Sequence, residues 1–487
     1  MNKRRYIQLG CMIGLTLLTQ LITLIKMSVV ASNFGVSVQM DAFNFSNNIA
    51  SFIFSFISTG VATVLIPAYI YKKSPTAINT FISVIYFFSI VSVIFIFAFR
   101  YSIASMFSPN KLFITTVCSL MFVILISQFT NTIIGVASAY LQSENVFNLP
   151  KIIVLITNLV LTSLTLLKKN MTIYDYSLFI LFTSFISMSL HIMLIKRFDF
   201  HYKVQFNLKN TDFKIMLHIF IPTIFSAGVY QITLLTDSLI ATSLGEGQIS
   251  LLNYSNSIMG MINMLLTTNL ITFIYPKISK DIENGNNDNK VFEFFPLFTF
   301  VMVLIVVGLI TIGEEGISLL YERGAFNRDF TSVIYICTII YSISLPINMV
   351  RELVYRSLYA HGDTKLTFYN SVSASIINFV LSILFSFFIG IYGIILGTVI
   401  TSIFSLSRII YKFCKKYKIK NIEPFIFIDI MKILVTAVLT VIIIFLIQNI
   451  IIINNSILFI LFYGILTVCI YLVLMLFMKV EFFKVKL

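Results

Sequence analysis

The sequence predicts an all-α polytopic membrane protein with about 14 transmembrane helices, arranged as two parallel six-helix lobes around a central cavity plus two C-terminal helices. Three observations predict this class. The 487 residues are 58% hydrophobic and 11% charged, with a mean hydropathy of +0.96, whereas soluble domains carry roughly 25% charged residues. Apolar runs of about 20 residues recur throughout, each long enough to cross ~30 Å of hydrocarbon. Finally, one polar motif occurs twice, once in each half of the chain.

The apolar runs give the expected helices. We place them at 7–32, 41–71, 77–99, 115–141, 149–167, 173–195, 214–243, 248–276, 291–312, 330–359, 366–388, 392–413, 425–447 and 456–478. The predicted domains are an N-terminal lobe over 1–200, a C-terminal lobe over 201–420 and two additional helices over 421–487. The first apolar run lacks a small-residue cleavage site, so it is interpreted as a retained span rather than a signal peptide.

The basic residues orient these spans. Of the 34 Lys and Arg residues, 27 fall on one side of the predicted topology, six fall on the other, and Lys26 lies within a span. The positive-inside rule therefore predicts a multi-pass protein of the bacterial cytoplasmic (inner) membrane with both termini in the cytoplasm. This bias explains the net charge of +14 without a nucleic-acid partner. The five cysteines are scattered and form no Cys/His cluster, so neither a disulfide framework nor a metal site is predicted.

The repeated motif relates the two halves. The hexapeptide Asn-Phe-Ser-Asn-Asn-Ile at 44–49 returns as Asn-Tyr-Ser-Asn-Ser-Ile at 253–258. The offset continues through three further pairs, namely Thr59 with Thr268, Thr63 with Thr272, and Pro67 with Pro276. Six helices separate the copies, so both copies cross the membrane in the same direction. Repeated halves of this kind are typical of transporters.

Polar side chains line one face of each repeated helix. In the second helix they are Asn44, Asn47, Asn48, Ser51 and Ser55, and in the eighth they are Asn253, Asn256 and Ser257. Steps of three and four place each set on one helical face. Since polar groups facing lipid are costly, each face must meet protein or water. We expect a shared substrate-binding cavity between the lobes; the alternative is a set of interhelical hydrogen bonds.

Two charged residues lie deep within spans. Lys26 is in the first predicted helix and Asp237 is at the matching place in the seventh. A charge near mid-bilayer costs at least ~2.5–3.5 kcal/mol, so each needs a partner or a hydrated site. The functional interpretation makes Lys26 an anion contact and Asp237 a cation or proton site. The alternative is a direct Lys26–Asp237 ion pair.

Several short segments, taken in order along nearly the whole chain, resemble one transporter family. They are Leu24-Ile25-Lys26, Asn33-Phe34-Gly35, Asp41-Ala42-Phe43, Ile66-Pro67, the YERGAF segment at 321–326, Tyr359-Ala360, Gly362-Asp363-Thr364-Lys365 and Tyr392-Gly393. The family is that of the MurJ/MviN lipid II flippases, within the multidrug/oligosaccharidyl-lipid/polysaccharide exporter superfamily. The resemblance implies a two-lobed transporter that moves an undecaprenyl-diphosphate-linked sugar by alternating access.

The resemblance also assigns site residues. Lys26 stands where the family has an essential arginine that faces the diphosphate, and Asp41 matches the family's aspartate at the start of the second helix. Two further arginines of the family fall near Phe54 and at Ser257, so both cationic positions are lost here. A single lysine also binds as a point charge, without the bidentate fork of arginine. The resemblance makes peptidoglycan lipid II the first expected cargo, and the loss of these cations makes a capsule or O-antigen type repeat unit the alternative.

Some members of the family carry a sodium site in the C-terminal lobe. The resemblance implies that Asp237, Asn378, Ser382 and Thr398 form a cation site here. Oxygen ligands of this kind suit a hard cation. Sodium or a proton is thus the expected coupling ion, and no other cofactor or metal is expected.

We expect no catalytic residue. The expected partners are the lipid-linked sugar diphosphate, membrane lipids and cell-wall synthesis proteins. Further alternatives are a cation-coupled multidrug antiporter and a non-transporting scaffold of a wall-synthesis complex. An integral glycosyltransferase would need acidic residues in a substantial outer loop, and the only large outer segment expected is 313–329.

Overall fold

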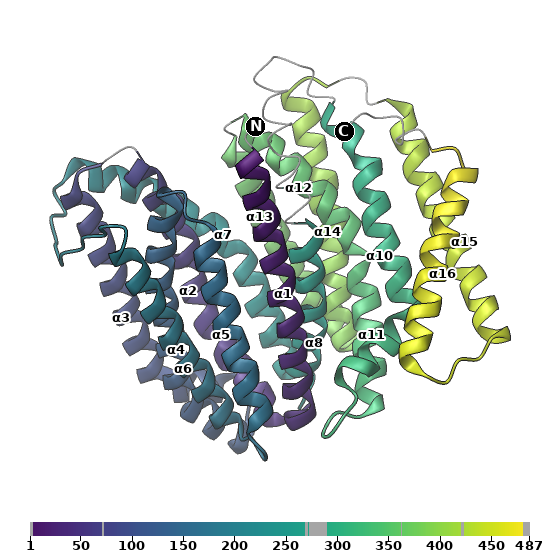
Figure 1. Cartoon of the computed structure of the whole chain (residues 1–487), viewed down its shortest axis with the longest axis horizontal. Helices are drawn as coiled ribbons and strands as arrows, with labels where there is room; N and C mark the ends of the chain where they lie inside the picture. Colours follow the sequence, from purple (N-terminus) through teal and green to yellow (C-terminus); the bar gives the residue numbers. More distant parts are fainter. Residues whose placement is uncertain are drawn as a thin grey trace. The chain divides into compact units, whose positions relative to one another are not determined.

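The computed structural model describes residues 3–70, 73–267, 271, 290–361, 363–419 and 423–480, and every regular element among them is a helix. The chain forms two compact units (Figure 1). Unit 1 comprises Met1–Ser250 together with Arg323–Phe326, and unit 2 comprises Leu251–Glu322 together with Asn327–Leu487. The tetrapeptide 323–326 thus packs with unit 1 although both of its neighbours in the chain belong to unit 2.

Seven helices lie wholly in unit 1. They are α1 (Lys3–Phe34), α2 (Val38–Ile70), α3 (Pro75–Phe107), α4 (Lys111–Ser143), α5 (Asn148–Leu167), α6 (Ile173–Lys196) and α7 (Thr211–Ser243). Polar residues fix several of their N-termini. Asn110 accepts hydrogen bonds from two backbone N–H groups at the start of α4, and Thr172 with Asp175 forms a capping box at the start of α6. Such caps satisfy donors that the first helical turn leaves unpaired.

The remaining helices lie in unit 2, except that the first turn of α8 is in unit 1. They are α8 (Gln248–Ile262), the π-helical turn η1 (Asn263–Thr267), α10 (Lys290–Tyr321), α11 (Arg328–Ser342), α12 (Ser344–Ala360), α13 (Thr364–Ile389), α14 (Ile391–Lys416), α15 (Pro424–Ile450) and α16 (Ser456–Phe477). Pro75 and Pro424 occupy the first turns of α3 and α15, where proline is favoured.

Every predicted span overlaps a described helix, and the predicted all-α polytopic class is confirmed. Eleven helices within the described ranges are long and apolar enough to cross a membrane, while the exact number 14 stays a prediction. The predicted span 330–359 is divided into α11 and α12 at Ile343. Pro346 explains this division, because its ring removes one helical hydrogen bond and clashes with the preceding turn.

The outer segment expected at 313–329 is much shorter than predicted. Helix α10 continues to Tyr321 and α11 begins at Arg328, so only Glu322–Asn327 lies between them. Polar contacts within unit 2 explain the extra turns of α10: Glu314 accepts a hydrogen bond from Ser332 (3.1 Å) and Glu315 accepts one from Ser456 (2.8 Å). The two carboxylates are therefore satisfied within the helical bundle rather than exposed in a loop.

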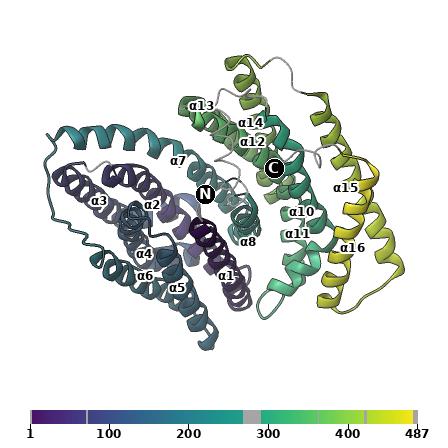
Figure 2. The same cartoon turned by 45° about the horizontal axis from the view of Figure 1, so that its top comes forward.

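Helix α2 is central to unit 1, since it packs against both α4 and α7, while α4 also contacts α3 and α6 (Figure 2). Helix α7 contacts α3 as well as α2, and therefore belongs to unit 1 by packing. The predicted lobes were defined by the repeat rather than by packing, so their boundary stays a prediction.

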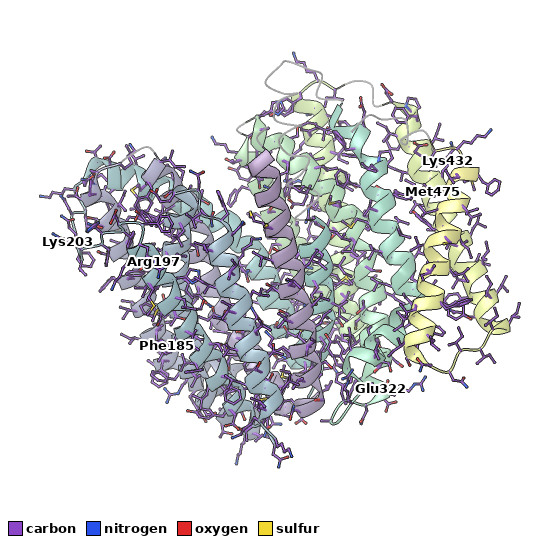
Figure 3. The ribbon with its side chains drawn as sticks, viewed as in Figure 1. Phe185, Arg197, Lys203, Glu322, Lys432 and Met475 are labelled. Carbon is purple, nitrogen blue, oxygen red and sulfur yellow. The ribbon has the colours of Figure 1, made fainter. Side chains whose placement is uncertain are left out.

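Helix α10 has the corresponding place in unit 2, where it contacts α11, α12, α15 and α16. The two helices predicted as additions to the second lobe, α15 and α16, lie side by side next to α10 in both views (Figures 1 and 2). Aromatic side chains fill the adjoining core, including Phe292, Phe298 and Phe413. At one end of the unit 2 helices Lys432 lies close to Met475, whereas Glu322 lies toward the other end of these helices (Figure 3).

Candidate functional site

The predicted polar face of α2 is bonded to a neighbouring helix in unit 1. Gln128 of α4 donates from its side-chain amide to Asn47 and to Ser51, with both distances 3.3 Å. Asn131, one turn further along α4, donates to the Gln128 oxygen at 3.2 Å. Gln128 and Asn131 were not identified from the sequence. Two amide side chains three residues apart in the middle of a predicted span were a signal that could have found them.

Two other amides of this face have different surroundings. Asn48 donates to the Ser238 hydroxyl of α7 at 2.7 Å. Asn44 is only 8% exposed, and its amide nitrogen has no hydrogen-bond partner in the described part of the chain. A buried donor without a partner is costly. The α2 face therefore combines interhelical hydrogen bonds, which the alternative interpretation predicted, with one unsatisfied amide suited to a ligand or water.

Asp41 lies at the start of α2 and binds the N-terminus of α8. Its carboxylate accepts hydrogen bonds from the backbone N–H of Gly247, from the backbone N–H of Ser250 (2.8 Å) and from the Ser250 hydroxyl (2.6 Å). The offset that relates Asn44 to Asn253 also relates Asp41 to Ser250. This arrangement gives Asp41 a structural role, and its predicted contact with substrate stays a prediction.

Lys26 lies half-buried in α1. No hydrogen bond or ion pair of its ammonium group occurs within the described ranges, so the alternative of a direct pair with Asp237 gains no support there. Phe54, near which the family has an arginine, is a core residue with 2% exposure. Its neighbour Ser55 is within α2, but its side chain lies outside the described residues, as do the repeat residues Thr268, Thr272 and Pro276.

The second polar face lies on α8 in unit 2. Asn253, Asn256 and Ser257 are half-buried. Ser257, where the family has its second lost arginine, donates its hydroxyl to the backbone carbonyl of Asn253 at 2.7 Å. This local bond occupies the Ser257 hydroxyl proton. The cavity predicted between the two faces stays a prediction.

Three of the four predicted cation ligands come together between α13 and α14. Asn378 donates to the Thr398 hydroxyl at 2.9 Å, and Ser382 donates to the backbone carbonyl of Ile394 at 3.3 Å. The Asn378 side-chain oxygen is buried and has no hydrogen-bond partner within the described ranges. Asp237 is a buried residue of α7 in unit 1. The sodium site itself stays a prediction.

A second half-buried lysine in unit 1 was not assigned a role from the sequence. Lys151, in the first turn of α5, donates to the Thr16 hydroxyl of α1 at 2.8 Å. Because α1 and α5 pack together, this ammonium group lies between two spans rather than in an open loop. Its position near the end of a predicted span made it indistinguishable from an ordinary interfacial lysine.

The YERGAF segment has a specific structural place. Gly324 has φ +59°, and a Cβ on it would lie 2.3 Å from the Ser32 carbonyl oxygen. The next residue, Ala325, donates its backbone N–H to the same oxygen at 2.8 Å. Only glycine combines this backbone conformation with so close an approach. The motif thus fits closely against the C-terminal end of α1.

The family model described as "Lipid II flippase MurJ" matches residues 30–470. This chain is a member of the MurJ family. The match covers most of the chain, and it confirms the resemblance that the short motifs indicated.

Curated relatives of this MurJ family member agree with that assignment. A "Probable lipid II flippase MurJ" from Rickettsia prowazekii is 27% identical over 261 residues, which are 52% of this chain and 50% of that protein. One from Vibrio cholerae is 26% identical over 192 residues, 39% of this chain and 37% of that protein. The aligned chain thus spans half or less of the length of these relatives.

Solved structures show the same fold over nearly the whole chain. "Lipid II flippase MurJ, inward closed conformation" has a TM-score of 0.80 at 22% identity, covering 96% of this chain and 98% of that one. An inward-facing multidrug resistance MATE family transporter has a TM-score of 0.68 at 10% identity, covering 84% and 98%. The MurJ fold of this chain is therefore also that of the wider transporter superfamily, as the sequence predicted.

Proposed function

We propose that this MurJ family member is a flippase that translocates an undecaprenyl-diphosphate-linked sugar precursor by alternating access. The first candidate cargo is peptidoglycan lipid II. Family membership supports a lipid-linked substrate. The observation that carries the proposal is Lys26, an ammonium group that lies within an apolar span of unit 1 without an ionic partner among the described residues. Keeping a charge there costs at least ~2.5–3.5 kcal/mol, which a diphosphate would offset.

The sugar would be bound by amides of the polar faces. Asn44 has a buried, unsatisfied donor, and Asn47 and Ser51 already form a hydrogen-bonded group with Gln128. Hydroxyl-rich sugars both donate and accept hydrogen bonds, so they match amide side chains that do the same. The prenyl chain would remain in lipid, because the outer faces of the spans are apolar.

A capsule or O-antigen type repeat unit on the same lipid carrier is the second candidate. It is favoured by Phe54 and Ser257, which replace two arginines of the family. A diphosphate would be held by fewer cations here than in other members, and sugar contacts would contribute more of the selectivity. Both candidates share the carrier lipid and differ in the saccharide.

Transport assays on Lys26 variants test the proposal. The full chain would be reconstituted in proteoliposomes with lipid II, and flipping would be followed by the accessibility of its headgroup. Lys26→Ala should reduce the initial rate about tenfold or more, since a charge-assisted hydrogen bond contributes roughly 1.5–3 kcal/mol. Lys26→Arg should retain activity, because the cation remains. Lys169→Ala, in an exposed loop, is the matched control and should leave the initial rate of flipping unchanged.

The outcome also separates the candidates. Rescue of a bacterium depleted of its lipid II flippase, abolished by Lys26→Ala, would support lipid II as cargo. Rescue only of a strain that lacks a capsule repeat-unit flippase would favour the second candidate. Rescue by the Lys26→Ala variant would refute the role of Lys26, whereas failure of the wild-type chain to rescue either strain would support a scaffold that binds wall-synthesis proteins.

The coupling ion and orientation are further parts of the proposal. We place both termini in the cytoplasm on the distribution of Lys and Arg. Sodium would be coordinated by Asp237 with Asn378, Ser382 and Thr398, or a proton would be carried by Asp237. If sodium couples transport, Asn378→Leu should abolish the sodium dependence of flipping but leave sodium-independent flipping intact.

A further inference from the structure

The segment that joins α6 to α7, residues 197–210, is held in a fixed position on unit 1; we call it the connector. Its Tyr202 hydroxyl and the Ser83 hydroxyl of α3 share a hydrogen bond at 3.0 Å. The backbone N–H of Gln205 donates to Ser83 at 3.0 Å, and that of Asn207 donates to Thr80 at 3.2 Å. The connector therefore runs along the first turns of α3 instead of extending freely into solvent.

Both ends of the connector are also fixed. At its start, Tyr140 of α4 donates to the backbone carbonyl of Phe198. At its end, Asn210 donates to the Thr76 hydroxyl at 3.1 Å. The next turn of chain forms an ion pair between Asp212 and Lys73 at 3.0 Å. Between its terminal turns, residues 200–207 are extended, and an extended segment held by such bonds presents a defined set of side chains to its surroundings.

Large apolar side chains occupy the outer side of the connector. Val204, Phe206 and Leu208 are 74%, 56% and 57% exposed, respectively. Alternate residues of an extended chain point to the same side, so Val204 and Phe206 share one side; Leu208 follows them in the turn that the Asn210 N–H closes on the Asn207 carbonyl, and the three exposed side chains are called the apolar row. The Phe206 ring packs edge-on against Phe87 of α3 at 6.4 Å between centroids, and Phe87 is itself exposed on an apolar membrane-spanning helix. The row is thus continuous with the lipid-facing surface of α3.

Basic side chains surround this apolar row. Arg197, Lys203 and Lys209 within the connector are exposed, as are Lys196 and Lys214 at its ends. Figure 3 shows Arg197 and Lys203 toward the same end of unit 1. The acidic residues here are Asp199 and Asp212, and Asp212 is already paired with Lys73. The local charge is therefore positive, as suits a segment that meets negative headgroups.

We infer that the connector is a membrane-surface anchor that binds anionic phospholipid in the adjacent leaflet. Val204, Phe206 and Leu208 enter the boundary between headgroups and acyl chains, and Lys203 and Lys209 contact headgroup phosphates. Apolar insertion combined with basic residues is the usual basis of interfacial binding. The hydrogen bonds to Thr80 and Ser83 would then hold the first turns of α3 at the same depth.

The absence of tryptophan from the sequence allows a direct test. Phe206→Trp introduces the only indole of the full chain at an exposed position. This variant would be reconstituted in phosphatidylcholine vesicles that contain either brominated phosphatidylglycerol or, in a parallel sample, the same fraction of brominated phosphatidylcholine. We expect both brominated lipids to quench the indole fluorescence strongly, and brominated phosphatidylglycerol to quench it more than brominated phosphatidylcholine does. Because both leaflets have the same composition, the orientation of the protein in the vesicle does not affect the result.

Charge variants identify the source of the preference. Lys203→Gln/Lys209→Gln in the Phe206→Trp background should reduce the phosphatidylglycerol preference by up to about fivefold per lysine, the factor that ~1 kcal/mol per residue represents. Lys111→Gln/Lys169→Gln, which neutralises two exposed lysines at the other end of the unit 1 helices, should leave it unchanged. Raised salt should weaken the preference in the Phe206→Trp protein.

Equal quenching by the two brominated lipids, or quenching no greater than that of a water-exposed indole, would overturn the inference. A loss of the same size in the Lys111/Lys169 variant would do so too. Native mass spectrometry gives a second readout that needs no tryptophan: the wild-type chain should retain more phosphatidylglycerol than Lys203→Gln/Lys209→Gln. Equal retention would count against the anchor. These measurements require no transport, so they are independent of the proposed function.

Discussion

Removing the carboxylate of Asp41 separates its structural role from its predicted role in substrate binding. In Asp41→Ala, two backbone donors and one hydroxyl at the start of α8 lose their acceptor. Hydrogen bonds to charged groups contribute roughly 1.5–3 kcal/mol each, and contributions from one site are not additive. Breaking a buried charged network costs about 3–5 kcal/mol. We therefore expect Asp41→Ala to lower the free energy of unfolding by about 4 kcal/mol.

Thermal unfolding of the purified full chain in detergent measures this effect without any substrate. A change of 1 kcal/mol shifts the Tm of a unit of ~250 residues by roughly 2 °C, so the midpoint should fall by about 8 °C. Asp41→Asn keeps one acceptor oxygen but turns an amide group toward a donor. Its Tm should therefore lie between those of the wild type and Asp41→Ala. Ser250→Ala removes only the hydroxyl bond to this carboxylate and should cost roughly 1.5–3 kcal/mol.

The double variant Asp41→Ala/Ser250→Ala completes the cycle. The two changes should be less than additive, because the hydroxyl bond is already lost in Asp41→Ala. The reasoning fails if Asp41→Ala is no less stable than Ser250→Ala. It also fails if the two effects add fully, since that would mean that the carboxylate and the hydroxyl act independently.

Three further predictions concern residues of unit 1: Gly324, Gln128 and the ion pair of Lys73 with Asp212. Gly324→Ala should destabilise the chain by about 2 kcal/mol or more, because φ is +59° and a Cβ meets a backbone carbonyl of α1; Gly308→Ala, in an open helical position, is the control and should not lower the Tm. Gln128→Leu should change stability by about 1 kcal/mol or less while slowing lipid II flipping severalfold; unchanged flipping would exclude this group from the substrate path. Asp212 precedes the predicted span 214–243. The hydrogen bond that it accepts from the Lys73 ammonium lowers the pKa of this carboxyl below the ordinary value for aspartate. Lys73→Gln should therefore be less stable than wild type at neutral pH, and the two should converge as acid protonates Asp212; a difference that persists in acid would contradict this.

The sequence predicted the helices because hydrophobicity and length are local properties. Apolar runs of membrane-spanning length leave the backbone no alternative to internal hydrogen bonds. The largest error was at 313–329, where Glu314 and Glu315 suggested a loop. The donors to these carboxylates, Ser332 and Ser456, are provided by other helices, and a local pattern does not contain that information.

The candidate site was predicted in part. Polar periodicity identified the α2 face, and the structure shows its bonds to Gln128 and Ser238. Periodicity indicates which residues share a face, but it does not give their partners on other helices. Asp41 illustrates the limit: the resemblance matched it to the family's aspartate at the start of the second helix, and only the fold brought it to the N-terminus of α8.

By itself, the sequence determined that this protein is a membrane-spanning helical member of a transporter family with a repeated polar motif and one lysine inside a span. The tertiary structure decided which of those polar groups are satisfied by neighbours, where 323–326 packs, and that the connector lies along α3. The physical reason is that solvation by lipid acts on each segment separately, whereas hydrogen bonds between segments distant in sequence depend on how the helices pack.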